Sequence, residues 1–299
     1  MKELFSLFKK KIVMELLIRC GILNKKRITI KGRPVLFTDI SKSKLLKEIV
    51  IEGYESYEGE LVTLLERYPW RIERFIDAGA YLGFYSVLAS VSFAKNTEII
   101  AIEPFPDNIK YIKKVMSENN LDFKLVEKAL DSSDRDAVMY YPVSKKRSRL
   151  PNSSSLINSF QETGGIFNHI PYKTLTVRTI TLPAVIGENA SPSLIKLDCE
   201  GNELSVLGAS SSVLKRENVD FIIEIIISDK NKDKVFNLMK ENGYAAYLMT
   251  NAGFVKEDRP LTLPKPGIKA RTIWKNHFFT KKPPGAVKDA SLELYGYYI

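Results

Sequence analysis

The stretch Phe75-Ile-Asp-Ala-Gly-Ala-Tyr-Leu-Gly-Phe-Tyr85 decides the fold of this chain. An apolar strand at residues 74–78 runs into a loop with two glycines, and an apolar helix follows at residues 82–93. This order brings backbone N–H groups and a helix N-terminus against a nucleotide-like ligand. Gly79 and Gly83 carry no Cβ and let the backbone approach closely. Asp77, at the strand end, is expected to direct its carboxylate into the crevice.

A second acidic residue follows the glycine loop at a distance typical of doubly wound sheets. Residues 98–102 predict the next strand, and Glu103 stands at its carboxyl end. An acid about 20 residues past the glycines holds a ribose diol in such folds. Both NAD and S-adenosyl-L-methionine stay open as ligands. The spacing Gly79-x-x-x-Gly83 differs from G-x-G-x-x-G and disfavours NAD, and a carboxylate before the loop suits a cationic or amino-bearing ligand better than a pyrophosphate.

The composition is that of a globular protein with one sizeable core: of 299 residues, 44% are hydrophobic and 27% are charged. The two cysteines, Cys20 and Cys199, give neither a disulfide framework nor a zinc-binding spacing. The two histidines, His169 and His277, exclude a His-rich metal site. The chain is therefore expected in a reducing compartment, the cytoplasm.

The net charge of +10 is concentrated in two flanks. Residues 1–33 carry ten Lys or Arg against two Glu, and residues 256–288 carry nine against two acids, whereas the middle of the chain is close to neutral. Such flanks suit an anionic partner, which could be a membrane surface, a phosphorylated glycan or nucleic acid. Alternatively, they serve only to keep the surface hydrated.

Residues 1–23 predict a helix with an apolar stripe. Lys9-Lys10-Lys11 interrupts the apolar run, so neither a membrane span nor a secretion signal is expected. This helix could lie on an anionic membrane, pack on its own domain or pack on a second copy. Residues 26–40 alternate like a hairpin with its turn at Gly32-Arg33-Pro34. We expect a basic N-terminal extension (1–50), a main domain (51–282) and a C-terminal tail (283–299).

The remaining pattern alternates strands and helices, as in an α/β fold. Residues 41–70 look helical and carry Glu60, whose carboxylate could reach an amino group of the ligand or could simply belong to a solvent-exposed helix start. Residues 144–170 are polar, contain His169 and predict a lid or substrate loop. Glu224, in a run of isoleucines, is either paired or functional. Further strands are expected at 123–130, 134–142, 175–181, 219–227, 244–249 and 271–279, and further helices at 109–119, 203–215 and 232–242.

A second informative stretch lies at residues 193–204. Lys196, Asp198 and Glu200 are spaced i, i+2, i+4, which on a strand places all three on one face, or in line into the crevice at its carboxyl end. Ionisable side chains on a strand otherwise destined for burial are costly unless they are paired or used. The end of a central strand is also where open α/β sheets bind ligands. We therefore interpret these residues as functional, with a structural Lys196–Asp198 salt bridge as the alternative.

Three segments together resemble the FkbM family of S-adenosylmethionine-dependent methyltransferases: residues 75–85, Ile102-Glu-Pro-Phe-Pro-Asp-Asn108 and Ile195-Lys-Leu-Asp-Cys-Glu-Gly-Asn-Glu-Leu204. The Lys-x-Asp-x-Glu-Gly element is the specific part. The resemblance implies a Rossmann-like class I α/β fold, with a seven-stranded, mostly parallel sheet, an antiparallel last strand and helices on both faces. It also implies S-adenosyl-L-methionine as cofactor and O-methylation, often of a sugar hydroxyl in a glycan, glycolipid or natural product.

Carried over to matching positions, Asp77, Gly79, Gly83 and Glu103 resemble cofactor residues, and Lys196, Asp198 and Glu200 resemble the family signature. Cys199 stands where a small aliphatic residue is common and is expected only to pack. The candidate cofactor-binding residues are Glu60, Asp77, Gly79, Ala80, Gly83, Tyr85, Glu103 and Asn108.

The transfer implied by the resemblance requires that the acceptor oxygen lie in line with the methyl–sulfur bond and lose its proton. We expect Asp198 or Glu200 to act as base and Lys196 to orient a carboxylate or the substrate. His169 is a second candidate base. Asp198 and Glu200 could also hold Mg²⁺, which leaves metal-assisted chemistry open, although we assign no metal ligand.

Other function classes fit the chain less well. The place after the fourth strand reads Asp198-Cys199-Glu200-Gly201 rather than Asn/Asp-Pro-Pro-Tyr, which disfavours N-methylation of nucleobases or amides, and no Pro-Cys nucleophile is present. The expected partner is a small-molecule or glycan acceptor rather than nucleic acid. The alternative from another class is a non-catalytic binding protein tethered by its basic flanks to membrane or nucleic acid. The intact glycine loop and strand-end ionisable residues speak against it.

Overall fold

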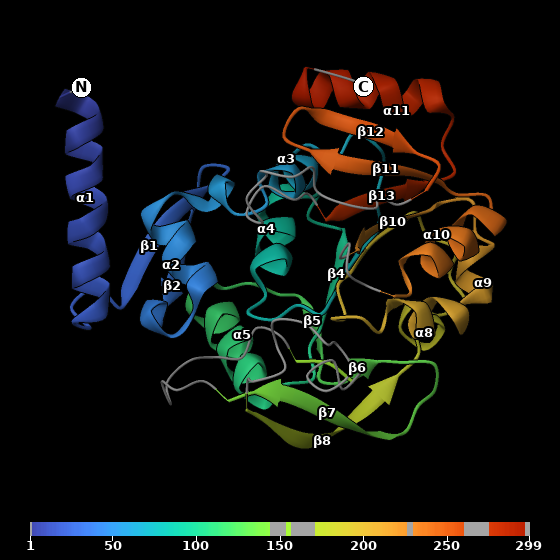
Figure 1. Cartoon of the computed structure of the whole chain (residues 1–299), viewed down its shortest axis with the longest axis horizontal. Coiled ribbons are helices and arrows are strands. Elements are labelled where there is room, and N and C mark those ends of the chain that lie inside the picture. The colour runs from blue at the N-terminus through green and yellow to red at the C-terminus, as the bar shows by residue number, and fades with distance from the viewer. Residues whose placement is uncertain (1, 144–153, 157–170, 226–229, 260–274, 297–299) are drawn as a thin grey trace.

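The computed structural model describes residues 2–143, 154–156, 171–225, 230–259 and 275–296, with the backbone alone for residues 2–10. At its centre lies an eight-stranded sheet in the order β12-β11-β13-β10-β9-β3-β4-β5 (Figure 1). Five neighbouring strands pair with one another in parallel: β3 (Arg74–Ala78), β4 (Glu98–Ile102), β5 (Lys124–Val126), β9 (Ser193–Leu197) and β10 (Val219–Glu224). The other three are β11 (Ala245–Thr250), β12 (Gly253–Glu257) and β13 (Asn276–Thr280).

The direction of chain progression reverses between β3 and β9. From β3 the chain moves outward through β4 to β5, and it then returns to the other side of β3 to form β9 and β10. The carboxyl ends of β3 and β9 therefore border the topological switch point, the place where open α/β sheets bind ligands. The last strand in the chain, β13, lies antiparallel to both of its neighbours, β10 and β11.

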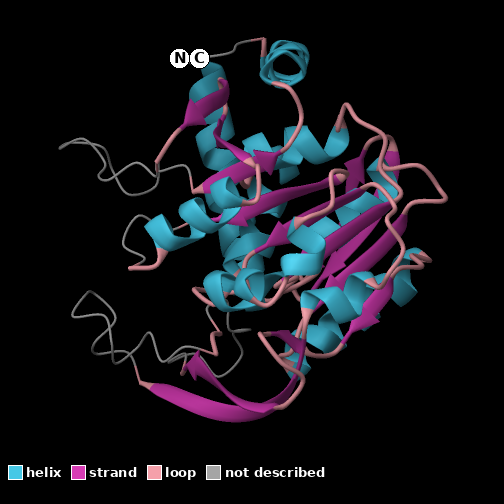
Figure 2. Cartoon of the chain, turned by 90° about the vertical axis from the view of Figure 1, so that its right-hand side faces the viewer, coloured by secondary structure: helices cyan, strands magenta, loops and turns pink. Residues whose placement is uncertain are grey.

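Helices cover both faces of the sheet (Figure 2). Successive side chains of a strand point to opposite faces, so Phe75 joins one apolar core and the neighbouring Ile76 joins the other. The first core is closed by α2 (Lys44–Ile51), α3 (Gly59–Glu66), α4 (Phe84–Ser92), α5 (Pro106–Asn119) and α11 (Pro284–Tyr295). The second is closed by α7 (Leu182–Ile186), α8 (Glu203–Gly208), α9 (Ser211–Leu214) and α10 (Lys232–Glu241). Short 3-10 turns lie at η1 (Ile40–Lys42) and η2 (Tyr54–Ser56).

The fold class predicted from the sequence is confirmed, but the sheet has one strand more than the seven expected. Residues 253–257 form the additional strand, β12, in a hairpin with β11. Gly253 has φ +125 and thus permits the sharp return after Thr250. Hydrophobic periodicity did not predict this strand, because its two apolar residues, Phe254 and Val255, are adjacent rather than alternating.

Three predicted elements are divided. The helical region expected at 41–70 consists of α2 and α3, with the short turns η1 and η2. The strand expected at 123–130 leaves the main sheet after β5, and its end forms β6 (Ala129–Leu130), which pairs with β8 (Tyr172–Ile180) in a small sheet with β7 (Asp136–Pro142). The helix expected at 203–215 breaks into α8 and α9. The hydroxyl of Ser210 donates to the Val206 carbonyl at 2.6 Å, a local bond that competes with continuation of the helix.

The N-terminal extension consists of α1 (Lys2–Arg19) and the hairpin β1 (Lys25–Ile30)–β2 (Arg33–Thr38). The hairpin turn lies at Lys31-Gly32, one step earlier than predicted, because Arg33 already pairs with Ile30. Its buried residues belong to the same core as the central strands. Within the part of the chain that the structure describes, no helix is both long enough and apolar enough to cross a membrane.

Candidate active site

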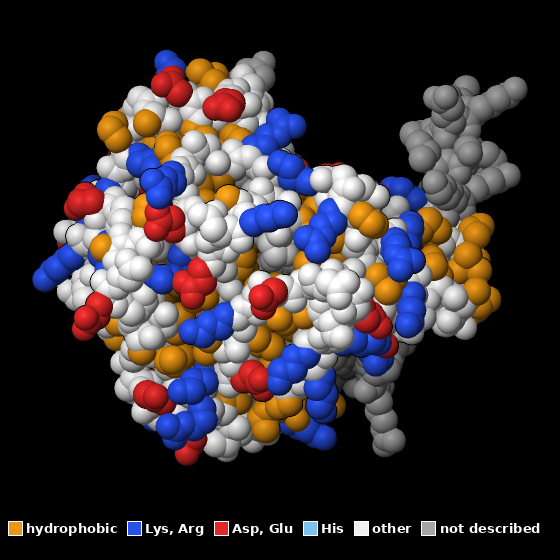
Figure 3. Space-filling model, turned by 180° about the vertical axis from the view of Figure 1, so that it is seen from behind, with side chains coloured by type: hydrophobic (Ala, Val, Ile, Leu, Met, Phe, Trp, Pro, Cys, Tyr) orange, Lys and Arg blue, Asp and Glu red, His pale blue; other side chains and the backbone are white. Residues whose placement is uncertain are grey.

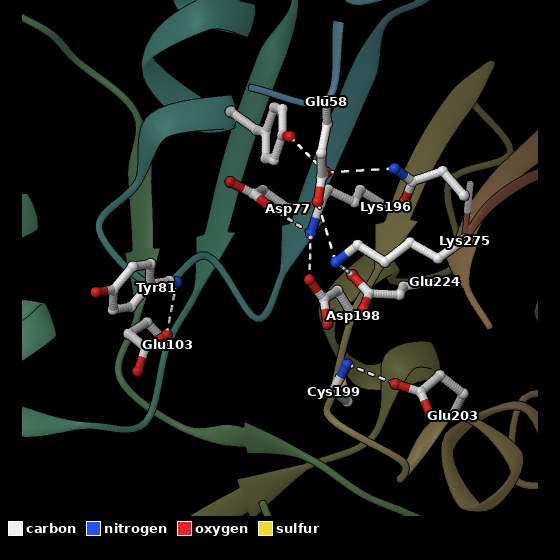
Figure 4. Close-up of polar contacts among 12 residues, drawn as sticks. Glu58, Asp77, Tyr81, Glu103, Lys196, Asp198, Cys199, Glu203, Glu224 and Lys275 are labelled. Carbon is white, nitrogen blue, oxygen red and sulfur yellow. Dashed lines mark hydrogen bonds and ion pairs between the residues drawn. The ribbon is translucent and has the colours of Figure 1, made fainter. Parts of the chain in front are cut away.

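Charged side chains gather where the central strands end (Figure 4). Asp77 is the penultimate residue of β3, and Glu103 directly follows β4. Lys196 and Asp198 lie on either side of the last residue of β9, and Glu224 is the last residue of β10. The structure brings Lys196 close to Asp77 and Asp198, whereas the sequence pattern had grouped Lys196 and Asp198 with Glu200. Glu103 lies on the far side of the glycine loop from this group.

The N–H groups of the glycine loop point inward rather than toward a ligand. Gly79 and Ala80 both donate to the Ile102 carbonyl at 3.0 Å, and Gly83 donates to the Ala80 carbonyl at 2.7 Å. Tyr81 donates to Oε2 of Glu103 at 2.8 Å. The expectation that this loop presents its backbone N–H groups to the ligand is therefore wrong for these four residues, because neighbouring carbonyls and Glu103 already accept from them.

Asp77 ties the end of β3 to the first turn of α4. Its Oδ2 accepts hydrogen bonds from the backbone N–H of Ser86 at 3.0 Å and from the Ser86 hydroxyl at 2.7 Å. The N-terminal turn of a helix is the place where an anion binds, and here the chain's own carboxylate fills it. Asp77 is fully buried, whereas we expected its carboxylate to face the crevice. Ser86, which the sequence reading missed, supplies both bonds.

Gly79 makes room for the turn that follows β9. It has φ +76, and a Cβ built on it would lie 1.8 Å from the Asp198 carbonyl oxygen. The Asp198 N–H in turn donates to the Ala78 carbonyl at 3.1 Å. The absent Cβ thus serves contact between two parts of the chain. Gly83, with φ +72, faces the Ile112 side chain of α5, where a Cβ would lie 3.2 Å from Cγ1.

Lys196 is the central cation of the site. Its side chain is 3% exposed, and its Nζ lies 3.2 Å from Oδ2 of Asp198 and 4.0 Å from Oδ1 of Asp77. The ammonium also lies 5.2 Å from the centre of the Tyr85 ring. Burial would lower the pKa of Lys196, but the charges of Asp198 and Asp77 outweigh burial and raise it. The Lys196–Asp198 salt bridge, which was the alternative interpretation, is thus present, and it lies within the same site.

Burial and charge act in opposite directions on the two carboxylates beside Lys196. Burial raises the pKa of Asp77 above its ordinary value, although Lys196 opposes this. Burial also works to raise the pKa of Asp198, but the charges of Lys196 and Lys275 outweigh it and hold that pKa below its ordinary value. Asp198 is therefore the carboxylate most firmly held in its ionised form.

A second lysine carries a set of contacts that the sequence reading missed. Nζ of Lys275, just before β13, lies 3.0 Å from Oε1 of Glu58 and also pairs with Glu224. Glu58 accepts in turn from the Tyr85 hydroxyl at 2.6 Å. Glu224 is therefore paired, which is one of the two possibilities that the sequence left open. Burial and the charge of Asp198 raise its pKa well above the ordinary value.

The start of α3 carries two glutamates, and Glu60, the one named from the sequence, does not contact the two lysines. Glu60 is buried, and its Oε1 accepts from Nδ2 of Asn276 at 3.3 Å, away from the two lysines. Burial raises its pKa. Glu58, two residues earlier and with φ +45, carries the carboxylate that reaches Tyr85 and Lys275. Because both residues are acidic, spacing alone could not separate them.

Glu200 lies in the turn after β9 rather than on the strand face. The strand ends at Leu197, and Glu200 has φ +52. Glu203 holds this turn, since its Oε1 accepts from the N–H groups of Cys199 at 2.7 Å and Gly201 at 3.3 Å. The hydroxyl of Ser155 donates to the Glu200 carbonyl at 2.7 Å. Burial, with the charge of Asp198, raises the pKa of Glu200 to about 8.

Glu103 is buried and held from several sides. In addition to the Tyr81 N–H, it accepts at Oε1 from the Phe105 N–H at 2.9 Å and from Nδ2 of Asn108 at 3.2 Å. Burial raises its pKa to about 7, although these bonds oppose the shift. Asn108 therefore donates a hydrogen bond directly to Glu103 and helps to fix the position of its carboxylate.

Two expectations from the sequence concern His169 and a metal ion. His169, the second candidate base, lies outside the described residues, as does most of the loop at 144–170. In the described ranges, no group of three or more His, Cys, Asp or Glu side chains is arranged to hold a metal ion.

Comparisons with known proteins show which family and which solved structures this chain is similar to. A family model described as the methyltransferase FkbM domain matches residues 77–246. No curated protein matches the chain. Among solved structures, the methyltransferase FkbM from Methylobacillus flagellatus KT is 14% identical, with 79% of this chain and 54% of that chain covered and a TM-score of 0.42. This chain thus spans about half the length of that protein.

Two further solved structures are similar to a comparable degree. The METTL16 methyltransferase domain is 10% identical, with 91% of this chain and 92% of that chain covered and a TM-score of 0.45. The O-methyltransferase TomG from Streptomyces achromogenes, solved in complex with SAM, is 9% identical, with 74% and 78% covered and a TM-score of 0.36.

Proposed function

The chain belongs to the FkbM family of methyltransferases, whose domain spans more than half of it, and on this premise we propose that it transfers a methyl group from S-adenosyl-L-methionine to a hydroxyl oxygen. The acceptor we propose is a sugar hydroxyl of a glycan, a glycolipid or a natural product.

One observation carries the choice of cofactor: the Asp77 carboxylate occupies the first turn of α4, where a pyrophosphate would otherwise bind. A dinucleotide would meet this carboxylate and a loop whose N–H groups are already bonded. At the carboxyl ends of the central strands, the carboxylates Glu58, Asp77 and Asp198 outnumber the two lysines that pair with them, even with Glu224, whose pKa burial raises, left out of the count. Such a surplus of negative charge suits a cationic ligand with a sulfonium and an ammonium group.

The residues present fit this cofactor. Oδ1 of Asp77 is buried without a hydrogen bond among the described residues, so acceptor capacity remains there. Oε2 of Glu103 accepts a single hydrogen bond, from the Tyr81 N–H, and so offers a further lone pair, and Glu103 stands where a ribose diol is held. S-adenosyl-L-methionine, when bound, supplies a methyl group made electrophilic by the sulfonium. The chain's task is to orient the acceptor hydroxyl and to take its proton.

For the proton we propose Glu200, with Asp198 and Lys196 as positioning residues. Asp198 is held by Lys196, so it is a weak base but a firm hydrogen-bond acceptor. The structure has no salt bridge to Glu200 within its described part, and burial raises the pKa of this carboxyl to about 8, which makes its carboxylate a stronger base. A base with a pKa near the operating pH transfers protons most effectively. His169 stays a second candidate.

The cofactor assignment is tested by calorimetric titration of the purified protein with S-adenosyl-L-methionine, S-adenosylhomocysteine and NAD. We expect micromolar dissociation constants for the first two and no heat of binding for NAD. Because Asp77 fills the anion position, Asp77→Asn should weaken binding of S-adenosyl-L-methionine without creating an NAD site. Binding of NAD alone would overturn the proposal.

The base is tested with Glu200→Gln and Asp198→Asn. We expect Glu200→Gln to slow methyl transfer at least roughly tenfold while leaving cofactor affinity nearly unchanged, because base assistance acts on the chemical step. Asp198→Asn, at a positioning residue, should also slow transfer and should weaken cofactor binding, because it removes one of the carboxylates that suit the cationic ligand. In the native protein the rate should rise as pH increases through about 8, since Glu200 acts only after it loses its proton. The measurement is formation of S-adenosylhomocysteine with an acceptor found by screening glycans. Glu217→Gln, at a side chain 82% exposed, is the control. Full activity in Glu200→Gln would remove the proposed base.

A further inference from the structure

The N-terminal helix α1 is apolar on two opposite faces. Ile18 is fully buried and Met14 packs against the core, which fastens one face of the helix to the body of the protein. Ile12, Val13 and Leu16 lie on the opposite face and are 44%, 52% and 54% exposed. A helix that only covers its own domain needs one apolar face. The outer face of α1 is therefore not explained by the fold.

Exposed apolar side chains are concentrated at this place. Of the six large hydrophobic residues found exposed among the described residues, four lie on α1 or directly after it, and the fourth of these, Ile22, is 74% exposed. The helix stands at the margin of the molecule, beside α2 and away from the sheet (Figure 1). Seen from behind, orange hydrophobic side chains gather at this margin with Lys and Arg beside them (Figure 3).

Basic side chains border this apolar face, and three of them pair with glutamates: Lys11 with Glu52, Arg19 with Glu15 and Lys25 with Glu118. Lys11 and Arg19 of α1 are exposed, and so are Lys25 and Arg27 of the adjoining strand β1. Residues 1–33 carry ten Lys or Arg against two Glu. An apolar strip bordered by basic side chains is the pattern of a helix that lies in the plane of an anionic membrane surface.

We propose that the outer face of α1, defined by Ile12, Val13 and Leu16, together with Ile22 just after the helix, docks on an anionic lipid bilayer. The apolar side chains enter the boundary between headgroups and acyl chains, and the basic residues beside them meet the lipid phosphates. A second copy of the chain is the competing occupant. A symmetric contact would bring the same basic segment against itself, and like charges facing each other oppose such a contact. This inference goes beyond the proposed methyl transfer and does not depend on it.

The test is flotation of the full chain with two kinds of vesicle, phosphatidylcholine alone and equal parts of phosphatidylcholine and phosphatidylglycerol. We expect recovery with the anionic vesicles, little recovery with the neutral ones, and loss of binding as salt rises. The variant Ile12→Ser/Val13→Ser/Leu16→Ser should weaken partitioning at least about tenfold, since it removes most of the apolar area offered to the lipid.

A matched control is Val138→Ser/Leu292→Ser, which removes the other two exposed large hydrophobic residues of the described chain and should bind vesicles as the native protein does. Both variants should keep the native thermal transition and the native affinity for S-adenosyl-L-methionine, because the changed side chains lie outside the core. Equal recovery with neutral and anionic vesicles would overturn the proposal, as would unchanged binding of the α1 variant. A dimer in solution that the α1 variant splits would assign the face to a second copy instead.

Discussion

Replacing Lys196 by methionine is expected to lower the free energy of unfolding by about 3–5 kcal/mol at neutral pH. Methionine fills much the same volume, but the variant leaves Asp77 fully buried and Asp198 largely buried without the cation that lies 4.0 and 3.2 Å from their carboxylate oxygens. An unpaired buried charge must lose its hydration with nothing in return. Urea unfolding followed by circular dichroism measures the loss.

The penalty should shrink as the pH falls. Burial already raises the pKa of Asp77, and Lys196 opposes that shift, so removal of the lysine raises the pKa further. The folded variant then binds a proton more tightly than the unfolded chain does, and its stability rises as pH falls through the pKa of the folded state. Unfolding measured at about pH 5 and about pH 8 should therefore show the larger difference from the native protein at the higher pH.

Lys281 supplies the matched control for Lys196. Its Nζ lies 3.2 Å from Glu217, whose side chain is 82% exposed, so Lys281→Met leaves a carboxylate that water can solvate. We expect a loss below about 1 kcal/mol from the broken pair. The double variant Asp77→Asn/Lys196→Met should recover part of the stability, since the asparagine oxygen still accepts from Ser86. Equal losses in Lys196→Met and Lys281→Met would contradict the central place of Lys196.

Gly79→Ala is expected to lower the free energy of unfolding by roughly 2–5 kcal/mol. The alanine Cβ would meet the Asp198 carbonyl oxygen at 1.8 Å, and φ +76 is strained for any residue with a Cβ. Relief requires that the glycine loop and the turn after β9 move apart. Because this movement separates Asp77 from Lys196 and Asp198, binding of S-adenosyl-L-methionine should fall below detection in the same preparation.

The comparison for this variant is Gly285→Ala in α11. No heavy atom lies within 4 Å of the Cβ position there, and the backbone is not in the left-handed region. Alanine at this helical position should stabilise the chain by about 0.5–1 kcal/mol. Native-like unfolding and cofactor binding by Gly79→Ala would show that the loop and the turn do not depend on their close approach.

The sequence determined those features that local patterns encode. Strand, loop and helix at residues 74–93 follow from apolar periodicity and from the two glycines, and the strand at 98–102 was placed at its observed bounds. The resemblance to the FkbM family was correct, since three short segments carry it. The same patterns predicted that Lys196 and Asp198 lie at the carboxyl end of a central strand and that Asp77 ends another, because those positions follow the apolar runs directly.

Tertiary structure alone decided where the groups of the site point and with whom they pair. Nothing in the local pattern indicates that the Gly79 and Ala80 N–H groups face the Ile102 carbonyl, or that Ser86 takes up Asp77. The meeting of Glu58 with Lys275, from opposite ends of the main domain, depends on the placement of β13 between β10 and β11. Hydrophobic periodicity records which face of an element is buried. The partner of a buried charge is selected by how the packed elements are arranged in three dimensions, which a one-dimensional period does not encode.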